Sequence, residues 1–92
     1  MNKYESIIII NPAVEEEKVK ELTDRFTAMI NEDGKVEKVD ILGKKKLAYE
    51  IKKNSEGIYV VLTFEAKPEF IVELERVFRI TDEVIKFIVV RS

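Results

Sequence analysis

The chain has 92 residues, of which 46% are hydrophobic and 37% charged, and its formal net charge is −2. This composition is typical of a soluble folded domain and excludes a disordered or low-complexity chain. The longest apolar run, Ile7 to Ile10, is far shorter than the roughly 20 residues of a membrane span. The first five residues do not open a signal peptide. We therefore expect one cytoplasmic domain over residues 1–92, with no membrane association.

The chain contains neither His nor Cys. Their absence removes the imidazole base, the thiolate nucleophile, the disulfide and the usual zinc ligands. The three glycines are also too far apart for a phosphate-binding glycine loop. We therefore expect a protein that is not an enzyme, with no metal, no cofactor and no small-molecule substrate.

The first two predicted elements are a strand and a helix. Residues 4–11 are expected to form a central strand, because Ile7 to Ile10 offers apolar side chains to both faces of a sheet. Asn11-Pro12 then predicts a helix start, with Asn as the cap and Pro at the first helical position. Gly34 is expected to end this helix. Its apolar stripe consists of Val19, Leu22, Phe26, Met29 and Ile30.

A second strand with broken alternation is expected from Val36 through Gly43 to Ile51. Gly43 can supply a positive φ or a bulge, which would re-aim the side chains after it. Apolar and polar side chains alternate after Lys46, in the period of a half-buried strand. The hairpin turn is predicted at Lys53 to Gly57.

Ile58 to Phe64 is predicted to be a third strand, apolar on both faces and therefore central. Pro68 is expected to start a second helix. Ile85 to Arg91 is expected to form the last strand. The apolar stripe of the second helix consists of Phe70, Ile71, Leu74, Val77 and Phe78.

This order of elements predicts an α+β fold, the ferredoxin-like βαββαβ sandwich. Its four-stranded antiparallel sheet has the order 4-1-3-2, with two helices on one face. The first and third strands lie in the middle, which agrees with the two most apolar runs. The side chains expected to face the helices are Ile8, Ile10, Val60, Leu62, Phe64, Phe87 and Val89. Those expected to face away are Ile7, Ile9, Tyr59, Val61, Ile88 and Val90.

The stretch from Gly43 to Lys53 holds five lysines against one acid, a formal charge of +4 in a chain with net charge −2. A phosphate backbone is a natural partner for such a segment. The alternative is a solvated strand edge that lysines protect from edge-to-edge pairing. The outward apolar residues predict a protein interface, unless the hairpin folds over them. Base stacking on the sheet is not expected, because residues 56–63 lack the aromatic pattern of RNA recognition motifs.

Several motifs together resemble the bacterial small-subunit ribosomal protein six family, over essentially the whole chain. The matching stretch is Gly43 to Ile51, and its most specific part is Gly43 to Tyr49, which reads glycine, two basic residues, any residue and then Leu-Ala-Tyr. The supporting motifs are Lys3-Tyr4-Glu5, Asn11-Pro12, Gly57, Arg79-Ile80-Thr81-Asp82 and Val89-Val90-Arg91.

The resemblance implies a structural protein of the ribosome that binds the central domain of the small-subunit ribosomal RNA together with ribosomal protein eighteen. Family members commonly have Arg in the basic run, whereas this chain has Lys, so phosphate contacts are expected there rather than base contacts. The candidate RNA-binding residues are Lys3, Lys44, Lys45, Lys46, Arg79, Lys86 and Arg91. The candidates for the protein partner are Tyr4, Ile9, Tyr49, Tyr59 and Val61.

Two other classes of protein fit the same fold. One is a ferredoxin-like regulatory module that binds a small molecule at a homodimer interface. The other is a dimeric α+β barrel enzyme, which would need a cleft with perturbed titratable groups. Both require the helix-free sheet face to close a homodimer.

Overall fold

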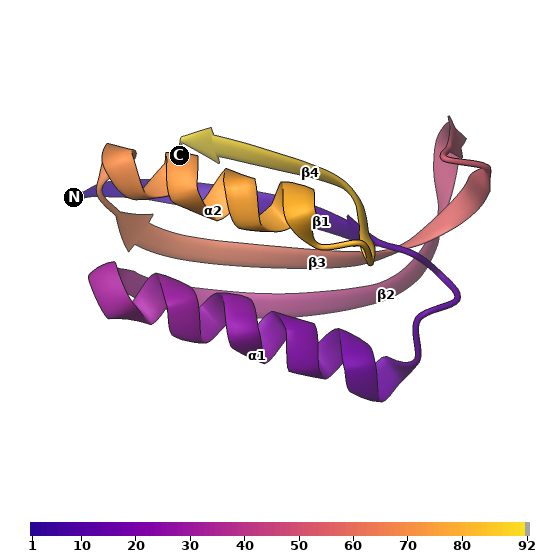
Figure 1. The fold of residues 1–92 in the computed structure, drawn as a ribbon, viewed down its shortest axis with the longest axis horizontal. Helices are drawn as coiled ribbons and strands as arrows, with labels where there is room; N and C mark the ends of the chain where they lie inside the picture. Colours follow the sequence, from indigo (N-terminus) through magenta and orange to yellow (C-terminus); the bar gives the residue numbers. More distant parts are fainter. Residues whose placement is uncertain (92) are drawn as a thin grey trace.

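The computed structural model describes residues 1–91, and it contains the six expected elements in the expected order. The strands form one antiparallel sheet with the order β2-β3-β1-β4, which is the predicted order read from the other edge. Both helices cover the same face of this sheet (Figure 1). The elements are β1 (Asn2–Ile10), α1 (Glu16–Asp33), β2 (Lys35–Ile51), β3 (Asn54–Ala66), α2 (Pro68–Ile80) and β4 (Val84–Arg91).

The main core lies between the helices and the sheet. Phe26 of α1 and Phe78 of α2 meet there edge to face, with ring centroids 4.9 Å apart. Because β1 and β3 pair in register, the side chains that face the helices alternate with those that face away. The predicted inward set is confirmed: Ile8, Ile10, Val60, Leu62 and Phe64 are buried in this core, and Phe87 and Val89 pack against it.

The start of α1 differs from the sequence prediction. Asn11 does not cap the helix; its side-chain Oδ1 accepts the Ala13 N–H at 2.9 Å, and its carbonyl accepts the Val14 N–H at 3.1 Å. These bonds close a separate turn around Pro12, so the helix begins at Glu16. An Asn-Pro pair favours a turn as much as a helix start, and in this chain it forms a turn.

The hairpin turn also differs from the prediction. Lys52 and Lys53 have φ values of 48° and 66°, and Ile51 pairs directly with Asn54. Two left-handed residues make the tight turn that best matches the twist of the flanking strands. The longer turn expected at Lys53 to Gly57 is therefore wrong, and Asn54 already belongs to β3.

The outer part of the β2–β3 hairpin, residues 43–57, turns sharply out of line with the inner part of the same two strands (Figure 1), and we call it the arm. Gly43 has a φ of 85°, and the register of β2 shifts between Ile41 and Gly43. The predicted bulge is confirmed. A left-handed residue and one extra residue bend the strand and re-aim the side chains beyond Gly43.

Candidate nucleic-acid and protein interface

Five of the predicted RNA-binding residues gather at one end of the sheet. Lys44, Lys45 and Lys46 lie on the arm and are exposed. Lys86 lies where β4 passes the arm, lining a hollow with residues 47–49. Arg79, near the end of α2, lines a neighbouring hollow with Lys86 and with Lys52 at the tip of the arm. The arm therefore joins Lys44 to Lys46, which we call the lysine run, to cations that are more than thirty positions away in sequence.

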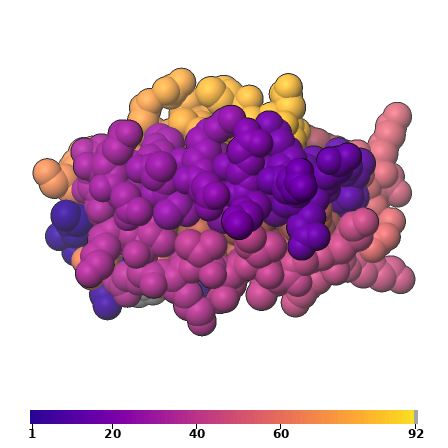
Figure 2. Space-filling model, turned by 90° about the horizontal axis from the view of Figure 1, so that it is seen from below, coloured from indigo at the N-terminus to yellow at the C-terminus, as the bar shows by residue number. Residues whose placement is uncertain are grey.

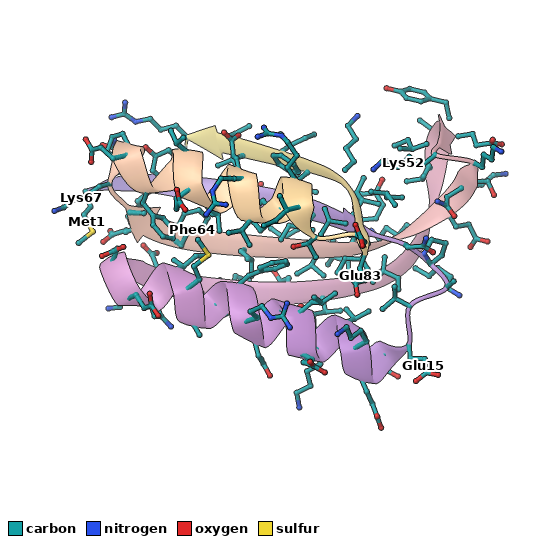
Figure 3. The ribbon with its side chains drawn as sticks, in the orientation of Figure 1. Met1, Glu15, Lys52, Phe64, Lys67 and Glu83 are labelled. Atoms are coloured by element: carbon teal, nitrogen blue, oxygen red, sulfur yellow. The ribbon has the colours of Figure 1, made fainter. Side chains whose placement is uncertain are left out.

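Lys3 and Arg91 lie at the other end of the sheet. The register pairs Tyr4 with Arg91 but Ile9 with Lys86, which separates the two groups by the length of β4. Lys3 Nζ is also 3.8 Å from Glu37 Oε1, and Arg91 Nη2 donates to Asn2 Oδ1 at 3.0 Å. In Figure 3, Lys52 stands at the opposite end of the molecule from Met1 and Lys67. The structure thus splits the seven predicted residues into two groups.

The lysine run wraps around the edge of the sheet. Lys45 pairs with Gly57, whereas Lys44 and Lys46 pair with the residues on either side of it. Side chains of a strand alternate between faces, so Lys45 points to the helix-free side. Lys44 points to the helix side, where it lines a hollow with Glu16. Because these side chains point to both faces of the sheet, an extended polyanion could contact all three lysines only along the outer edge of β2.

The helix-free face carries an apolar surface beside the arm. Tyr49 is 70% exposed, and Tyr59 and Val61 are partly buried. Tyr49 and Tyr59 line a hollow of about 220 Å³ together with Ile7 and Ile88. Small-molecule sites usually measure about 300–1,000 Å³, so this hollow does not favour the regulatory-module alternative.

An ion pair of titratable groups lies on α2, away from this face. The pKa of the Glu73 carboxyl is lowered by a hydrogen bond from the Arg76 guanidinium and by its charge, but this pair is exposed on the outer side of α2. Within residues 1–91, no three acidic side chains are placed to hold a metal ion together. In the same range, no helix has the length and apolar character to cross a membrane.

Comparison with known proteins shows the family to which this chain belongs. Residues 3–91 match the family model described as ribosomal protein S6. The chain belongs to the ribosomal protein S6 family. It is 54% identical over 93 residues to the small ribosomal subunit protein bS6 of Clostridium beijerinckii, covering 100% of this chain and 98% of that protein. The corresponding Clostridium kluyveri protein is 51% identical, with the same coverage.

Solved structures place the fold in the same family. The crystal structure of 30S ribosomal protein S6 from Thermotoga maritima is similar, with a TM-score of 0.93 and 41% sequence identity. The match covers 99% of this chain and 87% of that chain. The family and the fold predicted from sequence are thus confirmed, and the chain is a member of a family of small-subunit ribosomal proteins.

Two predicted partner residues of this S6-family chain need correction. Tyr4 is only 8% exposed, and its ring stacks on Phe64 in the core at a centroid distance of 5.8 Å. It lies on the same side of β1 as Ile8, so it belongs to the helix side. Ile9 does point away from the helices, but it is 6% exposed because Leu47 and Ile85 cover it. Neither side chain offers surface to a partner.

Sequence reasoning missed the residues that hold the arm in place. Leu47 is 7% exposed and packs with Ile9 and Ile85 in a second apolar cluster on the helix-free side. A bulge between β1 and β4 re-aims Ile85 into this cluster. Lys52 belongs to the positive segment, but its place near Arg79 depends on the two-residue turn and could not be read from the sequence.

Proposed function

We propose that this chain is a structural, non-enzymatic component of the small ribosomal subunit. It binds the central domain of the small-subunit ribosomal RNA through the end of the molecule that carries the arm, which we call the arm end. It binds ribosomal protein eighteen through the helix-free sheet face. The observation that carries this proposal is that the lysine run, Arg79 and Lys86 gather beside an exposed apolar surface. Family membership supports it independently.

The charge distribution favours contact of the arm end with RNA. The lysines are fixed to an ordered strand, so binding a phosphate backbone there costs little ordering entropy. On the helix side, α1 carries six acids against three bases, and it lies beside β2 over most of the face in Figure 2. An RNA would be repelled from α1 and drawn to the arm.

The apolar surface favours a protein partner next to the RNA. Ile88 and Val90 are 43% and 45% exposed, and with Tyr49 they line the helix-free side of β4 and the arm. Nearer the termini the face is mixed, because Glu5 lies between Thr63 of β3 and Val90 of β4. A partner on the apolar surface around Tyr49 and Ile88 would touch the arm and the RNA together, which would couple the two binding events.

Sedimentation of the purified chain tests this proposal, alone and with a central-domain RNA fragment and ribosomal protein eighteen. We expect a complex that contains all three components. Tyr49→Glu should weaken binding to protein eighteen at least tenfold, because an unpaired charge would be buried in the interface.

Val72→Glu is the matched control, because Val72 is 69% exposed but lies on α2. It should leave assembly unchanged. A wild-type chain that binds neither component would refute the proposal. Conversion of a homodimer to a monomer by Tyr49→Glu, without any partner present, would support the homodimer alternatives instead.

A further inference from the structure

A second basic feature lies where the arm tip, the end of α2 and the start of β4 meet. A hollow of about 210 Å³ opens there, and its lining includes Lys52, Arg79 and Lys86. The remaining lining residues are all apolar: Phe78, Val84, Ile85 and Phe87. Three basic residues from three separate segments thus line one small space that no acidic residue lines.

The fold sets the backbone positions of these three residues. Lys52 occupies the left-handed turn at the arm tip, where the Asn54 side-chain amide donates to its carbonyl at 3.2 Å. The Arg79 guanidinium lies over the ring of Phe87, 5.8 Å from the centroid, a cation–π distance. Lys86 follows Ile85, which is buried with Leu47 of the arm. The same apolar cluster that docks the arm therefore sets the geometry of the hollow.

Their charges are also uncompensated. Five other cations of the chain form ion pairs, such as Lys3 with Glu37 and Arg76 with Glu73. Over residues 1–91, none of the three cations of the hollow has an acidic partner within 4.0 Å. Asp82 and Glu83 are near in sequence but do not line the hollow. Three unpaired cations around one space create a local field that favours a compact anion.

We infer that this hollow, which we call the phosphate hollow, binds one phosphate group of the RNA backbone through Lys52, Arg79 and Lys86. Its volume, equal to roughly seven water molecules in the liquid, leaves room for a phosphate group and some of its water. The planar guanidinium of Arg79 can donate two parallel hydrogen bonds to phosphate oxygens, and the two ammonium groups supply point charges. The source of the phosphate rests on the proposed function.

The phosphate hollow is separate from the lysine run. Lys44 lines a different hollow, on the helix side near the start of α1. The RNA backbone would therefore touch the chain at two places, the outer edge of the arm and the hollow behind its tip. Removing the cations at one of these places should leave the RNA affinity that the other place contributes.

Two measurements test the inference. The first is an NMR titration of the whole chain with inorganic phosphate, which needs no RNA. Amide signals of Lys52, Arg79 and Lys86 should shift together and saturate, while those of Lys67 and Arg76 should not. Equal small shifts at all five would mean an adventitious ion only, and would overturn the phosphate hollow whether or not the chain binds RNA.

The second measurement is RNA affinity against salt for single alanine variants of the three cations. Each should lower the log–log salt slope by roughly 0.7–0.9, which at 0.1 M salt equals about 5- to 8-fold weaker binding. Lys67→Ala, at the opposite end of the molecule from Lys52, and Arg76→Ala, one helical turn before Arg79, are the matched controls. They should change affinity by less than about twofold.

The outcomes separate this inference from the proposed function. If the wild-type chain binds the RNA but the three variants match their controls, the phosphate hollow plays no part and the inference is overturned, while RNA binding stands. If phosphate saturates the hollow but the wild-type chain binds no RNA, the hollow is a phosphate site and the proposed function fails.

Discussion

Truncation of Leu47 to Ala probes how firmly the arm is docked on the sheet. Leu47 is 7% exposed and packs on Ile9 and Ile85. Leu-to-Ala changes in cores cost about 2–5 kcal/mol, and less where the site can collapse. The cluster has only three buried members and lies at the surface, so we expect about 2–3 kcal/mol.

A double-mutant cycle shows whether this cost comes from the docked arm. Residues in contact usually couple by about 0.5–3 kcal/mol, whereas independent sites add within about 0.5 kcal/mol. Leu47→Ala and Ile9→Ala should therefore couple by roughly 1 kcal/mol. Ile8 is the matched control, because it is the adjacent residue on β1 but lies in the core on the other face. Leu47→Ala and Ile8→Ala should be additive.

Urea unfolding of the single and double variants, followed by circular dichroism, gives the free energies for both cycles. The m-values should stay constant, so that the midpoints report stability alone. Additivity of Leu47→Ala with Ile9→Ala, or equal coupling to Ile8→Ala, would mean that the arm does not rest on the sheet as described.

Single contacts lead to three further predictions. Ser6 is 0% exposed and its Oγ has no hydrogen-bond partner, so Ser6→Ala should keep or raise stability by up to about 1 kcal/mol; a clear loss in urea unfolding would contradict this. Gly34→Ala should lower the free energy of unfolding by about 1–3 kcal/mol, because the added methyl group would overlap the Glu65 carbonyl oxygen. Unchanged stability would contradict this close approach of the backbone between α1 and β2 to β3. Arg76→Ala should raise the pKa of the Glu73 carboxyl toward its ordinary value, because the hydrogen bond and the charge of Arg76 lower it. An NMR titration that finds the same pKa in both proteins would contradict this ion pair.

The periodicity of the sequence was sufficient to predict the sheet and its two faces. Alternation in β1 and β3 assigned Ile8 and Leu62 to the helix side, and both are 0% exposed. Strand alternation and helical stripes are properties of short segments, so they can be read without knowing the neighbours. Applied consistently, the same alternation would have placed Tyr4 in the core.

The turns and the arm could not be predicted as well, because they depend on contacts between distant segments. Gly57 looked like a turn residue, yet it lies in β3, where an added methyl group would overlap the side chain of Ile9. Burial of Ile9 depends on Leu47 crossing over it, and the phosphate hollow depends on where Lys52 comes to lie. The composition of the arm was readable from the sequence, but its docking on the sheet was not.

The most direct test of the central claim compares two triple variants with the same loss of charge. One replaces Lys44, Lys45 and Lys46 of the arm by Ala, and the other replaces Lys18, Lys20 and Arg25 of α1. Binding to the central-domain RNA fragment is then measured against salt concentration. We expect the arm variant to lower the log–log salt slope by roughly 2–3 and the α1 variant to leave it nearly unchanged. An arm variant with wild-type affinity and slope, or an α1 variant that loses as much, would contradict the account.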